Sequence, residues 1–279
     1  MARVCVLGYD GLEPTLVESL GLRGLLQREH GRVRVPIAGG IDDPSTPIVW
    51  TSFITGQPPS VHGVDMPMVW DSPVDGLRSF LRKHRTLHGI AKRLRLGYRV
   101  RKRTGVEPVF PSRKHIRCDT IFDVVKPSIA ISVPVYNEDL HRTYPVGEVF
   151  KARQDPEFRR EYEARVRSIF QKEVEELFAA LDLEWRILMI HLHVTDLLGH
   201  VHWGTERLAL LYEEMDLLTR KVKERLGPRD LVLVISDHGM GRHGHTEHGF
   251  YSLSMELGLR DPEITDFFPV IRAVAEDEN

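Results

Sequence analysis

The residues best suited to chemistry are an acid and a histidine at the end of an apolar run. Asp237 and His238 come just after five consecutive apolar residues at 231–235. Such a run is typical of a strand buried on both faces of a parallel sheet, and the carboxyl ends of such strands bind ligands. A carboxylate beside an imidazole suits zinc or a similar divalent ion, although a polar strand end that caps a helix gives the same pattern.

Two earlier apolar runs also end in aspartate. The run at 186–194 leads to Asp196 and His200, and the run at 3–9 leads to Asp10. A spacing of four places Asp196 and His200 on one face if the chain turns helical after the strand, which suits two ligands of one ion. Three strands that end in aspartate, two of them with a paired histidine, favour a metal site over a purely structural arrangement.

The elements that must position these residues alternate between strands and helices. Apolar strands are expected at 3–9, 128–134, 186–194 and 231–236, with helices at 13–20, 119–126, 156–181 and 205–226. This alternation predicts an α/β protein with a mostly parallel central sheet. A length of 279 residues fits one large domain, 1–279. Beyond Phe250 the chain is expected to form an irregular cap.

A hydroxyl group precedes another helix-compatible run. Thr46 and Pro47 open an apolar stretch that stops at Gly56. Thr46 can be an ordinary N-cap, or a nucleophile at a helix start where the dipole favours anionic oxygens. Thr51 and Ser52 are expected inside the helix, with hydroxyls that bond back to the preceding turn.

The order of these motifs resembles the alkaline phosphatase superfamily, and it is closest to the type I phosphodiesterase/nucleotide pyrophosphatase branch. The motifs that carry the resemblance are Asp10-Gly11, Thr46, Thr55-Gly56 with Pro59 and His62-Gly63, Asp196 with His200, and Asp237-His238-Gly239-Met240. The resemblance implies a three-layer α/β/α sandwich. It also implies two divalent metal ions, usually Zn²⁺ with Mn²⁺ as the alternative, beside a phosphorylated or sulfated ester.

The resemblance also implies two sets of metal ligands. One set would be Asp10, Thr46, Asp237 and His238. The other would be Asp196, His200 and a later histidine, for which the His-Gly-aromatic pattern favours His248, with His245 as the second choice. His243 is expected to be solvated, and His191 and His193 to lie in the core or to orient ligands.

The implied activity is hydrolysis of a small anionic phosphate ester, with a nucleotide among the candidates, through Thr46 as nucleophile. Alternatives within the superfamily are a phosphomonoesterase, a phosphonate hydrolase, a sulfatase or a cofactor-independent phosphoglycerate mutase. The pair Thr46-Pro47 counts against a sulfatase, and the mutase normally carries a larger insert. A polyanion-binding protein with structural metals is the alternative outside enzymes.

Basic residues are concentrated in one segment, although the net charge is only −2. Residues 78–117 hold 14 Lys or Arg and one acid, Glu107. A solvated face, an anionic lipid surface and a nucleic-acid patch are all compatible with such a run. We favour an insert at about 66–117 that covers an anionic substrate as a lid.

The sequence also gives an expectation for location. The apolar start is too short for a signal peptide and runs directly into Asp10, and no apolar run approaches the roughly 20 residues that span a bilayer. A cytoplasmic protein is therefore expected. The sequence does not indicate an oligomeric state.

Overall fold

The fold is built on a central six-stranded sheet. The computed structural model describes residues 2–38, 40, 42–70, 108–137, 144–242 and 244–277. The strands lie in the order β2 (Glu29–Arg34), β10 (His248–Leu253), β7 (Leu231–Ile235), β1 (Val4–Tyr9), β6 (Ile187–Leu192) and β5 (Ser128–Ile131). From β7 to β5 each neighbouring pair is parallel, whereas β10 is antiparallel to both β7 and β2. The mostly parallel sheet predicted from the sequence is confirmed.

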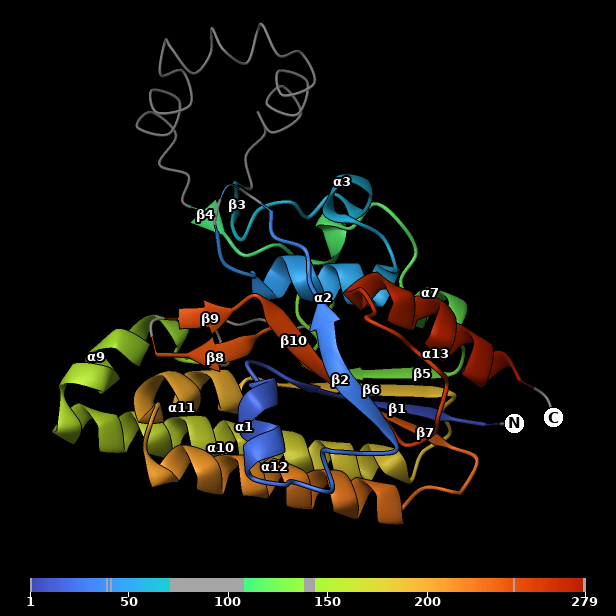
Figure 1. The fold of residues 1–279 in the computed structure, drawn as a ribbon. Helices are drawn as coiled ribbons and strands as arrows, with labels where there is room; N and C mark the ends of the chain where they lie inside the picture. Colours follow the sequence, from blue (N-terminus) through green and yellow to red (C-terminus); the bar gives the residue numbers. More distant parts are fainter. Residues whose placement is uncertain are drawn as a thin grey trace, which may run out of the picture.

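Helices cover both faces of this sheet (Figure 1). On one face lie α2 (Thr46–Thr55), α3 (Pro59–His62), α7 (Ile121–Val124) and α13 (Phe267–Glu276). On the other face lie α1 (Pro14–Ser19), α9 (Val149–Gln154), α10 (Pro156–Leu181), α11 (Val194–His202) and α12 (Glu206–Glu224). Alternate side chains of β1 enter two separate apolar clusters, with Leu7 in one and Val6 in the other. The three-layer α/β/α sandwich is therefore confirmed.

Local sequence signals explain where the long helix begins. The carboxylate of Asp155 accepts hydrogen bonds from the backbone N–H groups of Glu157 and Phe158, and Pro156 occupies the first helical position of α10. The bounds of α10 are those expected from the sequence.

The expectation of an irregular cap beyond Phe250 is wrong. β10 continues to Leu253, and α13 buries Phe267, Ile271 and Ala275, which are spaced four apart along one helix face. The short remaining elements are β3 (Val69–Trp70), β4 (Pro108–Val109), β8 (Gly239–Gly241), β9 (Gly244–Thr246) and the 3₁₀ turns Arg113–His115, Val146–Glu148 and Ile264–Asp266.

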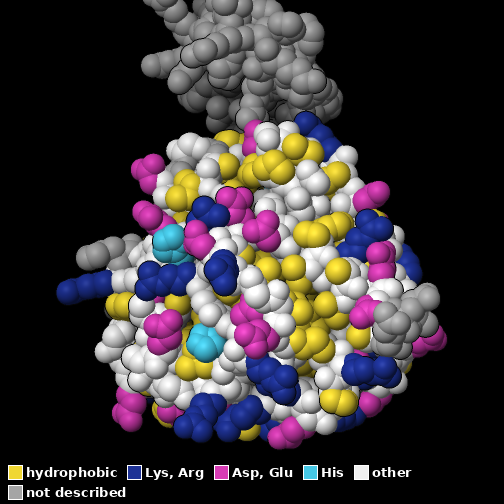
Figure 2. Space-filling model, turned by 45° about the vertical axis from the view of Figure 1, so that its right-hand side comes forward, with side chains coloured by type: hydrophobic (Ala, Val, Ile, Leu, Met, Phe, Trp, Pro, Cys, Tyr) yellow, Lys and Arg dark blue, Asp and Glu magenta, His cyan; other side chains and the backbone are white. Residues whose placement is uncertain are grey.

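Residues 71–107, which make up most of the insert expected at about 66–117, lie outside the described residues, so the lid stays a prediction. The positions that flank it are neighbours, because β3 and β4 pair as antiparallel strands. On the face drawn in Figure 2, basic and acidic side chains are interspersed among hydrophobic ones. None of the helices in the described part of the chain is both long and apolar enough to cross a membrane.

A buried histidine ties α2 to α3. His62 Nε2 lies 3.0 Å from Ser52 Oγ, and the backbone N–H of Val64 donates to His62 Nδ1 at 3.2 Å. The Ser52 hydroxyl in turn donates to the Ile48 carbonyl, so the imidazole donates through Nε2 and is neutral. Burial lowers the pKa of His62 to about 4. Thr51 bonds back to the Pro47 carbonyl, and both helix hydroxyls therefore have the structural roles expected of them.

We predict that His62→Ala destabilises the protein by about 1–3 kcal/mol near neutral pH, because it removes two buried hydrogen bonds. The difference should shrink as the pH falls from about 6.5 towards 4. In that window the unfolded wild type takes up a proton that the folded imidazole excludes, so stability of the wild type is lost, whereas the variant has no such group. Urea unfolding of both proteins at about pH 7.5 and 5 checks this.

His30→Ala, at an exposed histidine of β2, is the matched control and should change the free energy of unfolding much less than His62→Ala does at about pH 7.5. A difference between wild type and His62→Ala that is independent of pH would contradict the neutral imidazole.

Candidate metal centre

The three aspartates predicted from strand ends meet at one edge of the sheet. β1 lies between β6 and β7, with Tyr9 level with Leu192 and Gly8 level with Ile235. Asp10, Asp196 and Asp237 follow these three strands at their carboxyl ends. The sheet therefore brings together residues that are more than two hundred positions apart in the sequence.

Asp10, Asp237 and His238 form the first group of candidate ligands. His238 Nε2 lies 3.1 Å from Asp10 Oδ1 and 3.5 Å from Asp237 Oδ2. All three atoms are buried, and within the part of the chain that is described none of them has a hydrogen-bond partner. Two nitrogen or oxygen ligands of one tetrahedral Zn²⁺ lie roughly 3.3 Å apart, so these atoms approach one another as ligands of a shared ion do.

Asp196, His200 and His245 form the second group. Asp196 Oδ1 lies 3.2 Å from His200 Nε2 and 3.5 Å from His245 Nε2, and the two imidazole nitrogens are 3.3 Å apart. As the sequence predicted, α11 carries Asp196 and His200 one turn apart on one face. The rings of His238 and His245 stack with centroids 3.7 Å apart, so the two groups are neighbours.

The histidine in the second group is His245, the second choice of the sequence analysis. β8 and β9 form a hairpin that returns His245 to Asp196 soon after the Asp237-His238 pair. His248, the first choice, begins β10 opposite Arg34 of β2. It belongs to neither of these groups nor to the third group found among the described residues, which is Asp10 with His191 and His193. His243 lies outside the described residues. The geometry favours His245 as the third ligand.

Thr46 is the first residue of α2, and the N-cap position before it is Ser45. His245 Nδ1 lies 3.3 Å from the carbonyl oxygen of Pro44, which places the start of α2 beside the second group. One turn after Thr46, Trp50 packs against the ring of His191 on β6, with centroids 4.6 Å apart. The face of α2 that Thr46 shares with Trp50 therefore packs against β6, and no hydrogen bond of the Thr46 hydroxyl is found in the described ranges.

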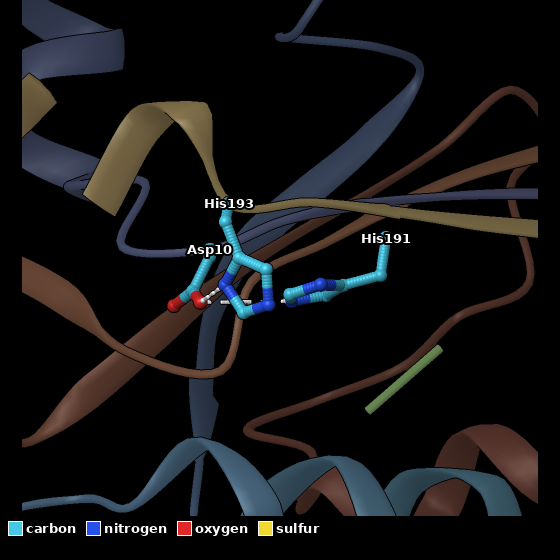
Figure 3. A group of neighbouring side chains, drawn as sticks. All are labelled: Asp10, His191 and His193. Atoms are coloured by element: carbon cyan, nitrogen blue, oxygen red, sulfur yellow. Dashed lines mark hydrogen bonds and ion pairs between the residues drawn. The ribbon is translucent and has the colours of Figure 1, made fainter. Parts of the chain in front are cut away.

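Two further histidines surround Asp10 (Figure 3). His193 Nδ1 lies 2.6 Å from Asp10 Oδ2, and His191 Nε2 lies 3.7 Å from the same oxygen. Asp10 therefore presents Oδ2 to β6 and Oδ1 to His238. A hydrogen bond from His193 to Asp10 would orient the carboxylate as a ligand, which is the supporting role that the sequence suggested.

Several residues that hold the site were missed in the sequence. The Ser236 hydroxyl accepts from the Leu12 N–H and donates to the His238 carbonyl. The Tyr212 hydroxyl of α12 accepts from the Glu13 N–H at 2.7 Å and donates to the Gly11 carbonyl at 3.2 Å. Only the position of Ser236 directly before Asp237 could have indicated such a role, because Tyr212 is distant in the sequence.

The charges of the first group are strongly coupled. Burial and the neighbouring Asp10 raise the pKa of Asp237 to about 7. Burial disfavours the charged form of His238, but the carboxylates of Asp237 and Asp10 outweigh it and raise the pKa of His238 to about 10. Burial likewise opposes the charge of Asp10, yet the hydrogen bond with His193 and the positive charge of the neighbouring His238 lower its pKa. Protons on Asp237 and His238 thus offset the negative charge of the buried carboxylates, and a bound divalent cation would take the place of these protons.

Comparison with known families identifies the family of the chain. The sequence model described as type I phosphodiesterase / nucleotide pyrophosphatase matches residues 4–253. The chain belongs to this family. The family consists of metal-dependent hydrolases of phosphoric esters in the alkaline phosphatase superfamily, so the resemblance drawn from the motifs is confirmed.

Solved structures support the same fold. Murine ectonucleotide pyrophosphatase / phosphodiesterase 5 is 14% identical with a TM-score of 0.50, and the match covers 86% of this chain and 59% of that one. The PH0037 protein from Pyrococcus horikoshii is 13% identical with a TM-score of 0.50, covering 100% and 98%. The chain thus spans about three fifths of the murine protein. A search of curated protein sequences finds no match.

We predict that His245→Ala lowers the bound metal by about one ion per chain, whereas His248→Ala leaves it unchanged. Removal of one of three ligands from the second group should weaken that site selectively. Elemental analysis after dialysis against dilute Zn²⁺ checks both variants beside the wild type. The assignment would be reversed if His248→Ala lost the ion and His245→Ala retained it.

Proposed function

We propose that the protein hydrolyses phosphate diesters or nucleotide pyrophosphate bonds through Thr46 and two divalent metal ions. One observation carries the proposal: the start of α2 and the ends of β1, β6 and β7 converge on two adjacent ligand groups. The substrate is a small anionic phosphate ester, and nucleotides are the leading candidates.

Two ligand sets would hold the ions. Asp10, Asp237 and His238 would hold one, with the Thr46 hydroxyl joining them. Asp196, His200 and His245 would hold the other. Zn²⁺ suits these oxygen and nitrogen donors, with Mn²⁺ as the alternative. Bound ions of this kind neutralise phosphoryl oxygens, lower the pKa of a neighbouring hydroxyl and stabilise a departing oxygen.

The reaction follows from the position of Thr46. The Thr46 hydroxyl releases its proton to solvent, its Oγ1 attacks phosphorus, the bond from phosphorus to the leaving oxygen breaks, and the leaving group departs with the electron pair. The resulting phosphothreonine is hydrolysed by water, which regenerates the hydroxyl. The positive end of the α2 dipole favours the anionic oxygen of Thr46, and no side-chain general base is needed.

The choice of substrate rests on the family and on one relative. A structure of murine ectonucleotide pyrophosphatase / phosphodiesterase 5, 11% identical to this chain with a TM-score of 0.50, holds AMP. That ligand makes a nucleotide a reasonable first substrate to test for this chain.

We predict that Thr46→Ala abolishes hydrolysis of bis-p-nitrophenyl phosphate, with a loss of at least about 10³-fold in kcat/KM, because the nucleophile is removed. Rates are measured with added Zn²⁺ or Mn²⁺, and p-nitrophenyl phosphate is compared in parallel. Thr51→Ser, which keeps the hydroxyl bonded to the Pro47 carbonyl, is the control and should remain active.

Activity retained by Thr46→Ala would eliminate the threonine nucleophile. A clear preference for p-nitrophenyl phosphate would instead favour a phosphomonoesterase.

A further inference from the structure

A pocket of about 390 Å³ opens beside the second ligand group. His200 forms part of its wall, and Val201 and Trp203 continue the wall at the end of α11. Arg153 and Arg242 complete the lining. The pocket is therefore continuous with one of the candidate metal ligands and combines apolar surface with two guanidinium groups.

The two arginines come from separate elements at one end of the molecule. Arg153 lies in the last turn of α9, and Arg242 lies in the turn between β8 and β9. Figure 1 shows α9, α11 and this hairpin gathered at the same end. The backbone at Arg153 is held in place because the guanidinium of Arg159 donates to its carbonyl oxygen at 2.7 Å.

Among the described residues, no acid neutralises either guanidinium. Both side chains are exposed, and within the described ranges no carboxylate forms an ion pair with Arg153 or Arg242. By contrast, arginines elsewhere on the surface pair with acids, as Arg207 does with Glu163 and Arg225 with Asp182. Planar guanidinium groups bind phosphate oxygens in pairs, so two of them around one pocket suit a phosphate group.

The position of the pocket indicates which part of the substrate would occupy it. It adjoins His200 of the second group, whereas the proposed function assigns the Thr46 hydroxyl to the first group. In an in-line displacement the leaving oxygen departs on the side opposite the nucleophile, which here is the side of the second group. A group in the pocket would therefore belong to the part of the substrate that departs.

We infer that Arg153 and Arg242 form a subsite for a phosphate carried by the leaving group, which selects substrates that release a phosphorylated product. This inference rests on the proposed function. In such a substrate the Thr46 hydroxyl releases its proton to solvent and its oxygen forms a bond to the first phosphorus. The bridging P–O bond breaks, and the terminal phosphate leaves with the electron pair while bound to the two arginines.

Two substrates that differ only in the leaving group test the subsite. Thymidine triphosphate releases pyrophosphate, and the p-nitrophenyl ester of thymidine 5′-monophosphate releases p-nitrophenolate, whereas both transfer the same thymidylyl group. Arg153→Gln and Arg242→Gln should each raise KM for the triphosphate about tenfold and leave kcat/KM for the nitrophenyl ester within about twofold. Arg260→Gln, at an exposed arginine beyond β10, is the matched control and should change neither.

A binding measurement separates this inference from the proposed function. Calorimetry with inorganic pyrophosphate on the metal-free protein should show about tenfold weaker binding to the double variant Arg153→Gln/Arg242→Gln than to the wild type. If neither thymidine triphosphate nor the nitrophenyl ester is hydrolysed, but pyrophosphate binding depends on the two arginines, the proposed function fails and the subsite stands.

If the nitrophenyl ester is hydrolysed through Thr46 but the arginine variants alter neither KM nor pyrophosphate binding, the subsite is overturned and the proposed function stands. The same holds if the metal-free wild type binds no pyrophosphate.

Discussion

The structure depends on holding three carboxylates together at the end of one sheet. Asp10 and Asp237 are almost completely buried, and Asp196 lies directly beside the glycine that follows Asp10. Carboxylates this close repel one another, and burial removes the water that would otherwise screen them. Imidazoles supply positive charge only while they are protonated. Divalent cations therefore suit this arrangement better than protons do, since their charge does not depend on protonation of the histidines.

The loops around the carboxylates leave little freedom to adjust. Gly11 has a φ of +70°, and a Cβ there would lie 3.2 Å from the Cα of Asp196. At Gly239 a Cβ would lie 2.2 Å from Glu13 Oε2, the oxygen that accepts from Thr246 next to His245. A side chain at Gly11 would strain the backbone, and one at Gly239 would displace the side chains of Glu13 and Thr246, so glycine at both positions favours the close approach of the two ligand groups. The same hydrogen bond ties the hairpin that carries His245 to the loop that follows Asp10.

The sequence predicted the parts of the site that follow directly from strand periodicity. Apolar runs locate β1, β6 and β7, and a ligand one or two residues after a buried strand lies at the sheet edge wherever the strand is placed. Asp196 and His200 followed from helical spacing. The choice between His245 and His248 depends on the hairpin of β8 and β9, whose course no periodic pattern records. Likewise, Arg153 and Arg242 become neighbours of one pocket only through the packing of α9 and the hairpin around α11.

The two ligand groups differ in their access to solvent, and this difference suggests which group serves the nucleophile and which serves the leaving group. The side chains of the first group are at most 2% exposed, whereas those of the second group are 15–24% exposed. A buried first group, which on the proposed function takes the Thr46 hydroxyl as a further ligand, suits activation of a residue of the protein, because Thr46 never has to leave. The more open second group suits a product that must depart, and the pocket with Arg153 and Arg242 opens on that side. On the proposed mechanism, burial thus distinguishes the nucleophile side from the leaving-group side even though both groups offer similar donor atoms.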